Sequence, residues 1–256
     1  ILQSLIPYLK RDDEIDIQKI MNWEEVKEII VPELVCTRRA GENLEDLIYR
    51  NVEGTDLAII YRVKQQVANI VGSIKVSKQM METWGVDENR IHEFAFHNMN
   101  QLSTLQIVEL NSDFAMPEET FSELPEKMNK YSSYVFTNKE AFYGAATIME
   151  EGMLHSIAER LQEGFYLLPM DVDNIVVYPE GMMKNLESIH SMVLIHNIQC
   201  LEPENYLSDQ VYYYSKEKGE LSMSTNPENT QDVIIKILQQ AMECSPGKKE
   251  DYGEER

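Results

Sequence analysis

Several features that would point directly to a function are missing from this 256-residue chain. No apolar run approaches the roughly 20 residues that a membrane-spanning helix needs. There is also no Lys/Arg-rich run and no arginine stripe with interleaved aromatic residues. The 44 acidic residues against 23 lysines and arginines leave a formal charge of −21, which repels polyphosphate. We therefore expect neither a nucleic-acid partner nor a membrane partner.

The cysteines are few and scattered. Cys36, Cys200 and Cys244 have neither metal-binding nor redox spacing. An odd number of cysteines without a secretory signal is typical of a reducing compartment, so we predict free thiols and a cytoplasmic protein. The apolar fraction of 43% is that of an ordinary globular chain. Because the first residue is Ile1 and not Met, we expect the chain to be a piece of a longer protein.

The motifs of common enzyme classes are also absent from the sequence. It contains no Gly-rich phosphate loop, no G-x-G-x-x-G, no serine elbow and no cysteine paired with an ordered His motif. A well-specified core without a reactive constellation favours a non-catalytic protein. We predict no cofactor, and a role in binding a protein partner or a small ligand.

The apolar pattern of the first half predicts short helices and strands. Asn22 with Glu25 at the third position is a near capping box, which opens a short helix that Pro32 ends. Residues 57–63 form a nearly continuous apolar run, as in a strand covered on both faces. The other elements expected here are a strand at 34–38, a helix at 43–49, a half-exposed edge strand at 72–78 and a helix that Asp87 caps.

The second half shows a clearer pattern. Apolar residues of 142–161 fall on one helix face, so one long helix is predicted there. Two strands, 165–170 and 175–178, follow and are joined by the turn residues 171–174, which suits a hairpin. The remaining predicted elements are a helix at 184–198, a strand at 211–214 and a helix at 231–242.

These elements predict an α+β fold made of two small, mostly antiparallel sheets with helices packed on one face. We place an N-terminal subdomain at 1–110, a linker or surface excursion at 111–132, a C-terminal subdomain at 133–244 and a flexible tail at 245–256. An internal echo, Val76-Ser-Lys before Trp84-Gly85 and Phe136-Thr-Asn before Tyr143-Gly144, suggests that the two subdomains are related.

One helix face suggests metal chemistry. Glu151, His155 and Glu159 are spaced four apart, so they would share a face of the predicted helix and could hold a metal or tune a general base. This trio, with Asp171 or Asp173 nearby, is the basis of an alternative function, a metal-dependent hydrolase. A solvated polar face is the simpler interpretation, and we favour it.

Two other groups of residues resemble active-site motifs but lack the right geometry. His92 and His97 are five apart, which places them about 140° apart around a helix, so they do not share a face. Asp171 and Asp173 follow an apolar strand, as in enzymes that use an aspartate nucleophile, but such enzymes need a long crossover after that strand. Here a second strand begins almost at once, so we interpret both residues as part of a hairpin turn.

Two stretches carry a family resemblance in matching order. The first contains Trp23-Glu-Glu-Val-Lys, Asp56-Leu-Ala-Ile-Ile-Tyr61 and Trp84-Gly85; the second contains Thr137-Asn138, Tyr143-Gly-Ala-Ala146, Phe165-Tyr-Leu-Leu-Pro169, 175–179, Tyr206-Leu-Ser-Asp209 and Val211-Tyr212. They resemble an uncharacterised bacterial family, a numbered domain of unknown function (DUF) widespread in anaerobic Gram-positive gut bacteria.

The resemblance implies no activity, cofactor or catalytic residue, because none is assigned to the family. It also implies that an N-terminal segment of the family precedes the point where this chain begins. A further alternative function is an acidic mobile-element or defence-associated protein whose charge mimics nucleic acid.

Overall fold

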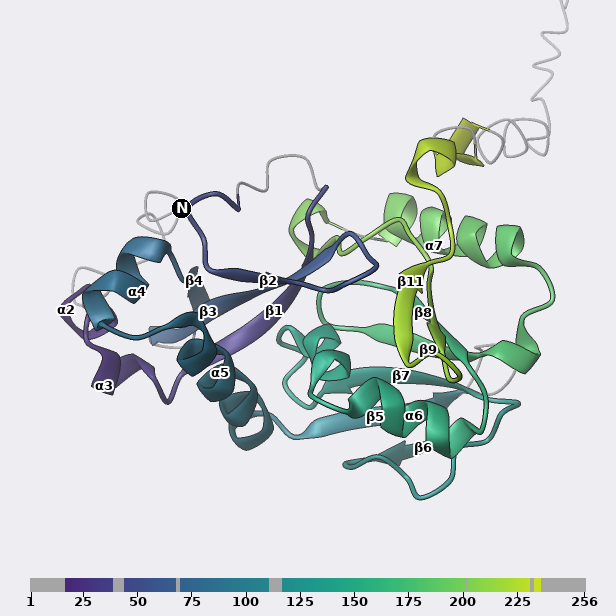
Figure 1. The fold of residues 1–256 in the computed structure, drawn as a ribbon, viewed down its shortest axis with the longest axis horizontal. Helices are drawn as coiled ribbons and strands as arrows, with labels where there is room; N and C mark the ends of the chain where they lie inside the picture. The colour runs from purple at the N-terminus through teal and green to yellow at the C-terminus, as the bar shows by residue number, and fades with distance from the viewer. Residues whose placement is uncertain are drawn as a thin grey trace, which may run out of the picture.

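The computed structural model describes residues 17–38, 44–67, 70–110, 117–200, 202–230 and 233–235. Two antiparallel sheets with helices packed against them make up the fold, which is the predicted α+β class (Figure 1). The first sheet contains β1 to β4, and the second contains β5 to β11.

The first sheet is built around the long strand β3 (Leu57–Val67). On one side β3 pairs with β1 (Ile30–Cys36), and on the other with β2 (Tyr49–Asn51) and then β4 (Ile70–Lys75). The apolar run of β3 contacts a layer on each face, as predicted, because Tyr61 and Val63 join the main core and Ala58 and Ile60 join a smaller cluster. β4 is a half-exposed edge strand, also as predicted.

The second sheet has seven strands in the order β11-β10-β8-β9-β7-β5-β6. Every neighbouring pair in this order is antiparallel. Its strands are β5 (Leu105–Leu110), β6 (Pro117–Phe121), β7 (Ser133–Asn138), β8 (Phe165–Pro169), β9 (Ile175–Pro179), β10 (Tyr212–Ser215) and β11 (Glu220–Met223).

Helices cover both faces of this sheet, which corrects the prediction of helices on one face. α6 (Met153–Leu161) and the 3-10 helix η2 (Gly144–Met149) pack on one face with Leu167 and Val177. α7 (Leu186–Cys200) packs on the other face, where Val193 meets Leu168 and Val176 (Figure 1). Neighbouring residues of β8 and of β9 point to opposite faces, so each of these strands contributes to both cores.

The remaining helices lie close to the first sheet or in connecting segments. α5 (Glu88–Leu102) packs on β1, and Asp87 caps it as predicted, accepting from the Arg90 amide at 2.8 Å. The other helical elements are α2 (Ile17–Ile20), α3 (Trp23–Val26), α4 (Lys78–Trp84), η3 (Glu180–Met182), η4 (Pro203–Asn205) and η5 (Pro227–Asn229).

Three local predictions differ from the structure. Asn22 caps α3 as expected, but α3 ends at Val26, and Pro32 lies within β1, opposite Tyr61. A proline fits there because β1 is an edge strand. The helix expected at 43–49 is instead a turn that leads into β2. The described part of the expected linker contains β6, which pairs with β5.

The largest hydrophobic cluster contains residues of both sheets, from Ile30 on β1 to Tyr212 on β10. The division into subdomains stays a prediction, as does their relatedness. Most of the predicted final helix and the whole of the predicted tail lie outside the described residues. Within the described part of the chain, no helix is long and apolar enough to cross a membrane.

Candidate functional site

The predicted helix at 142–161 is interrupted, and this separates the candidate metal ligands. η2 is followed by a turn, and α6 starts only after Gly152, whose φ is +76°. Glu151 lies in that turn, whereas His155 and Glu159 lie on α6. All three side chains are exposed, and Glu159 forms an ion pair with Lys216 at 3.4 Å.

No metal site is assembled from these or from other described residues. Across the described ranges, no group of three or more His, Cys, Asp or Glu side chains is placed to hold a metal ion. The even spacing in the sequence depended on one continuous helix, and the turn before α6 removes that common face. The geometry therefore gives the hydrolase alternative no support.

Asp171 and Asp173 lie in the predicted hairpin turn between β8 and β9. Asp171 Oδ1 accepts hydrogen bonds from the Asp173 amide and the Asn174 side chain, both at 2.8 Å. Asp173 Oδ1 accepts from the Tyr143 amide at 2.6 Å. Burial, together with the carboxylates of Asp171 and Glu33, raises the pKa of Asp173 to about 6. Asp171 holds the turn in place, and Asp173 connects the turn to Tyr143.

The segment that Asp173 holds carries backbone strain. Tyr143 has a φ of +55° and Ala141 a φ of +46°, values that are uncommon for residues other than glycine. The Tyr143 hydroxyl lies 2.8 Å from Ser73 Oγ, which accepts a hydrogen bond from Arg62 at 3.0 Å. These contacts connect η2 with the first sheet, so the strained segment belongs to the junction between the sheets.

The two histidines on α5 do not form a pair. His92 is half-buried, and its Nδ1 lies 2.9 Å from the Tyr61 hydroxyl, whereas His97 is exposed. Burial, and then the positive charge of Arg50, lower the pKa of His92. His92 is a hydrogen-bond partner of a buried tyrosine and does not act together with His97.

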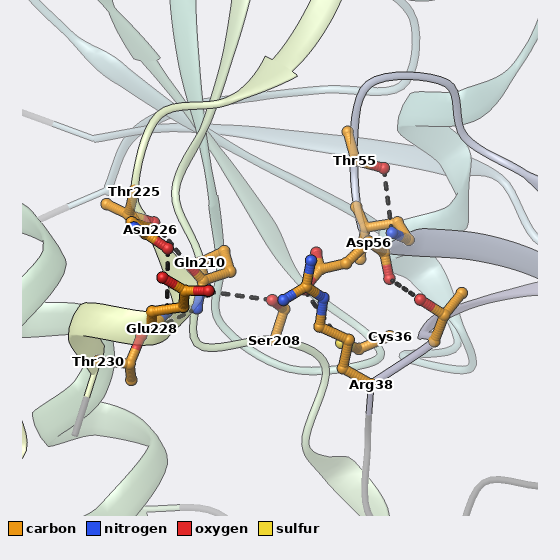
Figure 2. A network of polar contacts seen from close by, with 12 residues as sticks. Cys36, Arg38, Thr55, Asp56, Ser208, Gln210, Thr225, Asn226, Glu228 and Thr230 are labelled. Atoms are coloured by element: carbon orange, nitrogen blue, oxygen red, sulfur yellow. Dashed lines mark hydrogen bonds and ion pairs between the residues drawn. The ribbon is translucent and has the colours of Figure 1, made fainter.

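A pocket of about 330 Å³, lined by several polar and charged residues, lies where the two sheets meet. The first sheet contributes the end of β1 and the turn before β3, and the second contributes the segment before β10 and the region around η5 (Figure 2). Its lining residues are Cys36, Arg38, Asp56, Tyr206, Ser208, Asp209, Gln210, Pro227, Thr230 and Ile234.

A chain of hydrogen bonds ends on the buried carboxylate of Asp56. The Tyr212 hydroxyl donates to Asp56 Oδ1 at 2.7 Å and also lies 2.7 Å from Ser208 Oγ. Because the single proton of Tyr212 goes to the carboxylate, the Ser208 hydroxyl donates to Tyr212. Ser208 Oγ in turn accepts from the Gln210 amide at 3.0 Å. Each donor in such a chain polarises the next, which strengthens the bonds.

The second oxygen of Asp56 has weaker partners. The Cys36 thiol lies 3.6 Å from Oδ2, and Arg38 Nε lies 3.7 Å from the same atom. The Asp56 side chain is 4% exposed and that of Arg38 is 55% exposed, so the guanidinium lies at the mouth of the pocket. Figure 2 shows the Arg38 side chain projecting between Asp56 and Ser208.

A second group of hydrogen bonds holds the opposite wall. The Gln210 side chain donates to Thr230 Oγ1 at 3.1 Å and accepts from the Thr225 hydroxyl at 2.8 Å. Thr225 Oγ1 also accepts from the Val211 amide at 3.0 Å. The side-chain oxygen and nitrogen of Gln210 are therefore both occupied, which fixes the wall of the pocket before any ligand binds.

α7 supports the segment that carries Ser208 and Asp209. The Nε2 atom of His190 lies 2.8 Å from the backbone oxygen of Asp209. The Asn197 side chain donates to the Ser208 backbone oxygen at 3.0 Å and to Asp209 Oδ1 at 2.8 Å. The position of the segment thus depends on the helix that covers the second face of the sheet.

The surroundings keep the Cys36 thiol and the Tyr212 hydroxyl in their protonated forms. Burial, and then the charge of Asp56, raise the pKa of the Cys36 thiol to about 11. The same two causes raise the pKa of the Tyr212 hydroxyl well above its usual value. A neutral thiol is a poor nucleophile, so these groups act as hydrogen-bond donors.

The sequence did not identify this site. Asp56 and Ser208 each belong to a stretch that carries the family resemblance, but nothing in the sequence indicated that the two stretches touch. Their one signal was local: each is a polar residue beside a strongly apolar strand.

The chain matches a known protein family. Residues 2–216 match the family of unknown function DUF5688. The chain belongs to this DUF5688 family. The match confirms the resemblance to a DUF family, whereas the bacterial source, the gut habitat and the N-terminal segment stay predictions. No curated protein and no solved structure matches.

Proposed function

We propose that this member of the DUF5688 family is a non-catalytic binding protein, and that the pocket between the two sheets is its ligand site. One observation carries the proposal: a pocket of about 330 Å³ is lined by polar groups from both sheets, held in fixed orientation by hydrogen bonds. Polar groups fixed in this way are typical of sites that orient a small ligand.

The protonation states of the pocket groups favour binding over catalysis. The Cys36 thiol stays neutral because its pKa is raised to about 11, so it is not activated as a nucleophile. Asp56 already accepts a hydrogen bond from Tyr212 and has Arg38 beside it, so its carboxylate oxygens are engaged within the protein. These groups are suited to recognising a ligand without reacting with it.

The proposal includes the cellular location of the protein. A bacterial cytoplasmic location fits the free thiol of Cys36 and the small number of cysteines. The alternative of an acidic nucleic-acid mimic has the formal charge of −21 as its support. The pocket is a more specific feature than this charge, because acidity alone also serves solubility.

Native mass spectrometry with a defined mixture of small polar metabolites tests the proposal. We expect an adduct with the wild type that is lost in Thr230→Leu, whose larger side chain fills the pocket, and in Arg38→Trp, which covers its mouth. Thr83→Leu makes the same change on the exposed face of α4 and should keep the adduct. An adduct that survives both pocket substitutions in folded protein would contradict the proposal, as would turnover that Cys36→Ser abolishes.

A further inference from the structure

The guanidinium of Arg38 has N–H groups that can donate hydrogen bonds to a ligand. Its Nε faces Asp56 Oδ2 at 3.7 Å, and within the described ranges its two Nη nitrogens form no hydrogen bond. A guanidinium carries five N–H donors, and the pair of Nη groups matches the two oxygens of a carboxylate. Arg38 therefore offers a carboxylate-binding edge at the mouth of the pocket.

Thr230 adds a donor from the opposite wall. Its side chain is buried, and Oγ1 accepts a hydrogen bond from Gln210 at 3.1 Å. A hydroxyl that accepts one hydrogen bond still has its own proton to donate. Arg38 and this hydroxyl are both hydrogen-bond donors, so a ligand that contacts them must supply an acceptor.

Asp209 supplies the opposite charge. It lines the pocket and is half-buried, and the described partners of its side chain are the Asn197 amide, at 2.8 Å, and the hydroxyl of Tyr206. Both partners are neutral, so its negative charge is not balanced by a cation within the pocket. Asp56 differs because Arg38 faces it directly. Asp209 is thus the carboxylate available to a positively charged group of a ligand.

The net charge of the lining decides among simple ligands. Arg38 against Asp56 and Asp209 leaves one excess negative charge, which disfavours a purely anionic ligand. A purely cationic ligand would satisfy Asp209 but leave the donors of Arg38 and Thr230 without an acceptor. A ligand that carries both an ammonium and a carboxylate satisfies both requirements.

We propose that the pocket binds a small zwitterion of the amino-acid class, with its carboxylate on Arg38 and Thr230 and its ammonium on Asp209. This inference rests on the proposed function and adds the ligand class to it. The volume of about 330 Å³ is at the lower end for ligand pockets, which suits one amino acid. A free amino acid carries both charges on one carbon, whereas each end of a longer peptide carries only one of them.

Isothermal titration with matched ligands tests the assignment. L-serine, L-leucine and L-glutamine are each compared with the primary amide, which lacks the carboxylate, and with the N-acetyl acid, which lacks the ammonium. A dipeptide of the same residue tests whether the two charges must sit on one carbon. We expect at least one free amino acid to bind about tenfold or more tightly than both of its analogues, because each analogue loses a charge-assisted hydrogen bond.

Two variants test which residue binds each charged group of the ligand, and a third serves as the control. Arg38→Gln should abolish the preference for the amino acid over its amide, and Asp209→Asn should abolish the preference over the N-acetyl acid. Asp209→Asn keeps an oxygen that can accept from Asn197, and Arg38 is largely exposed, so both variants should fold. Arg90→Gln removes the same charge from an exposed position on α5 and should leave every affinity unchanged.

The outcomes separate this inference from the proposed function. Equal binding of all three ligand forms, abolished by Thr230→Leu, would overturn the ligand class while leaving the pocket as a binding site. Failure of every free amino acid to bind would overturn the class as well. Binding that is indifferent to Thr230→Leu would overturn the pocket itself, and the proposed function with it.

Discussion

The Tyr212 hydroxyl donates to the Asp56 carboxylate at 2.7 Å, although the two residues are 156 positions apart in the chain. Tyr212 lies on β10 of the second sheet, and Asp56 precedes β3 of the first. Both side chains are buried. This hydrogen bond therefore connects the two sheets at the point where the pocket forms.

Tyr212→Phe tests the energy of this connection. It removes a donor to a buried carboxylate, so we expect a loss of about 2–3 kcal/mol in the free energy of unfolding, measured in urea. Tyr214→Phe is the matched control, since Tyr214 is also buried on β10 and, in the described part of the chain, its hydroxyl forms no hydrogen bond. It should cost less than about 1 kcal/mol. Equal losses in the two variants would show that the hydroxyl bond adds nothing.

Gly54→Ala tests the close approach of the turn before β3 to β11. A Cβ at Gly54 would lie 2.2 Å from the Leu221 backbone oxygen, and φ there is +76°. Gly85 has a similar φ of +67° but nothing within 4 Å of the added Cβ. We expect Gly85→Ala to cost about 1 kcal/mol through backbone strain and Gly54→Ala about 2–4 kcal/mol, by urea denaturation. Similar losses of stability in the two variants would mean that the Leu221 backbone shifts easily to accommodate the added Cβ.

Asp173→Asn should change how stability depends on pH. Burial, with the charges of Asp171 and Glu33, raises the pKa of Asp173 in the folded state to about 6 from 3.8. A raised carboxyl pKa means that the folded state binds the proton more tightly, so its contribution is full below pH 3.8 and is lost as pH rises through about 6. The neutral amide avoids that loss and still accepts from Tyr143.

Urea denaturation of Asp173→Asn and the wild type between pH 4 and pH 8 measures this effect. Relative to the wild type, the variant should gain stability as pH rises across this range, by on the order of 1 kcal/mol once solvent screening is allowed for. Asp171→Asn is not a suitable control because it changes a carboxylate that acts on Asp173. A stability difference that does not vary with pH would contradict an elevated pKa.

The Cys36 thiol should react slowly. Its pKa of about 11 against an ordinary value of 9.0 lowers the thiolate fraction by about 100-fold, and burial slows the reaction further. We expect iodoacetamide at pH 8 to leave Cys36 unmodified in native protein and to modify it in urea, as measured by peptide mass mapping. Rapid modification in the native state would contradict the buried, hydrogen-bonded thiol.

Predictions that depend on local pattern were largely correct. The apolar run of residues 57–63 gave a strand covered on both faces, Asp87 caps α5, and residues 171–174 form the hairpin turn. Each of these signals lies within a few residues of the element it predicts. The turn before α6 was missed because Ala146, Met149 and Met153 keep helical spacing across it in the sequence, so 142–161 resembled one helix.

The pocket could not be predicted because it depends on which distant segments meet. Asp56, Ser208 and Arg38 have no meaningful spacing in the sequence, and only the pairing of the strands brings them together. The helix predicted at 43–49 failed for the same reason, since Leu47 forms a β-bridge with Ser77 and Tyr49 pairs with Ile60 of β3. Tertiary contacts here override the local pattern.

The most direct test of the pocket is a titration of ¹⁵N-labelled protein with the tightest-binding amino acid of the panel, followed by NMR. We predict that the largest chemical-shift changes occur at the backbone amides of Ser208 and Gln210 and at the side-chain amide of Gln210, and that they saturate with the calorimetric affinity. Saturable changes concentrated elsewhere, with these three signals unmoved, would contradict the assignment of the pocket as the ligand site.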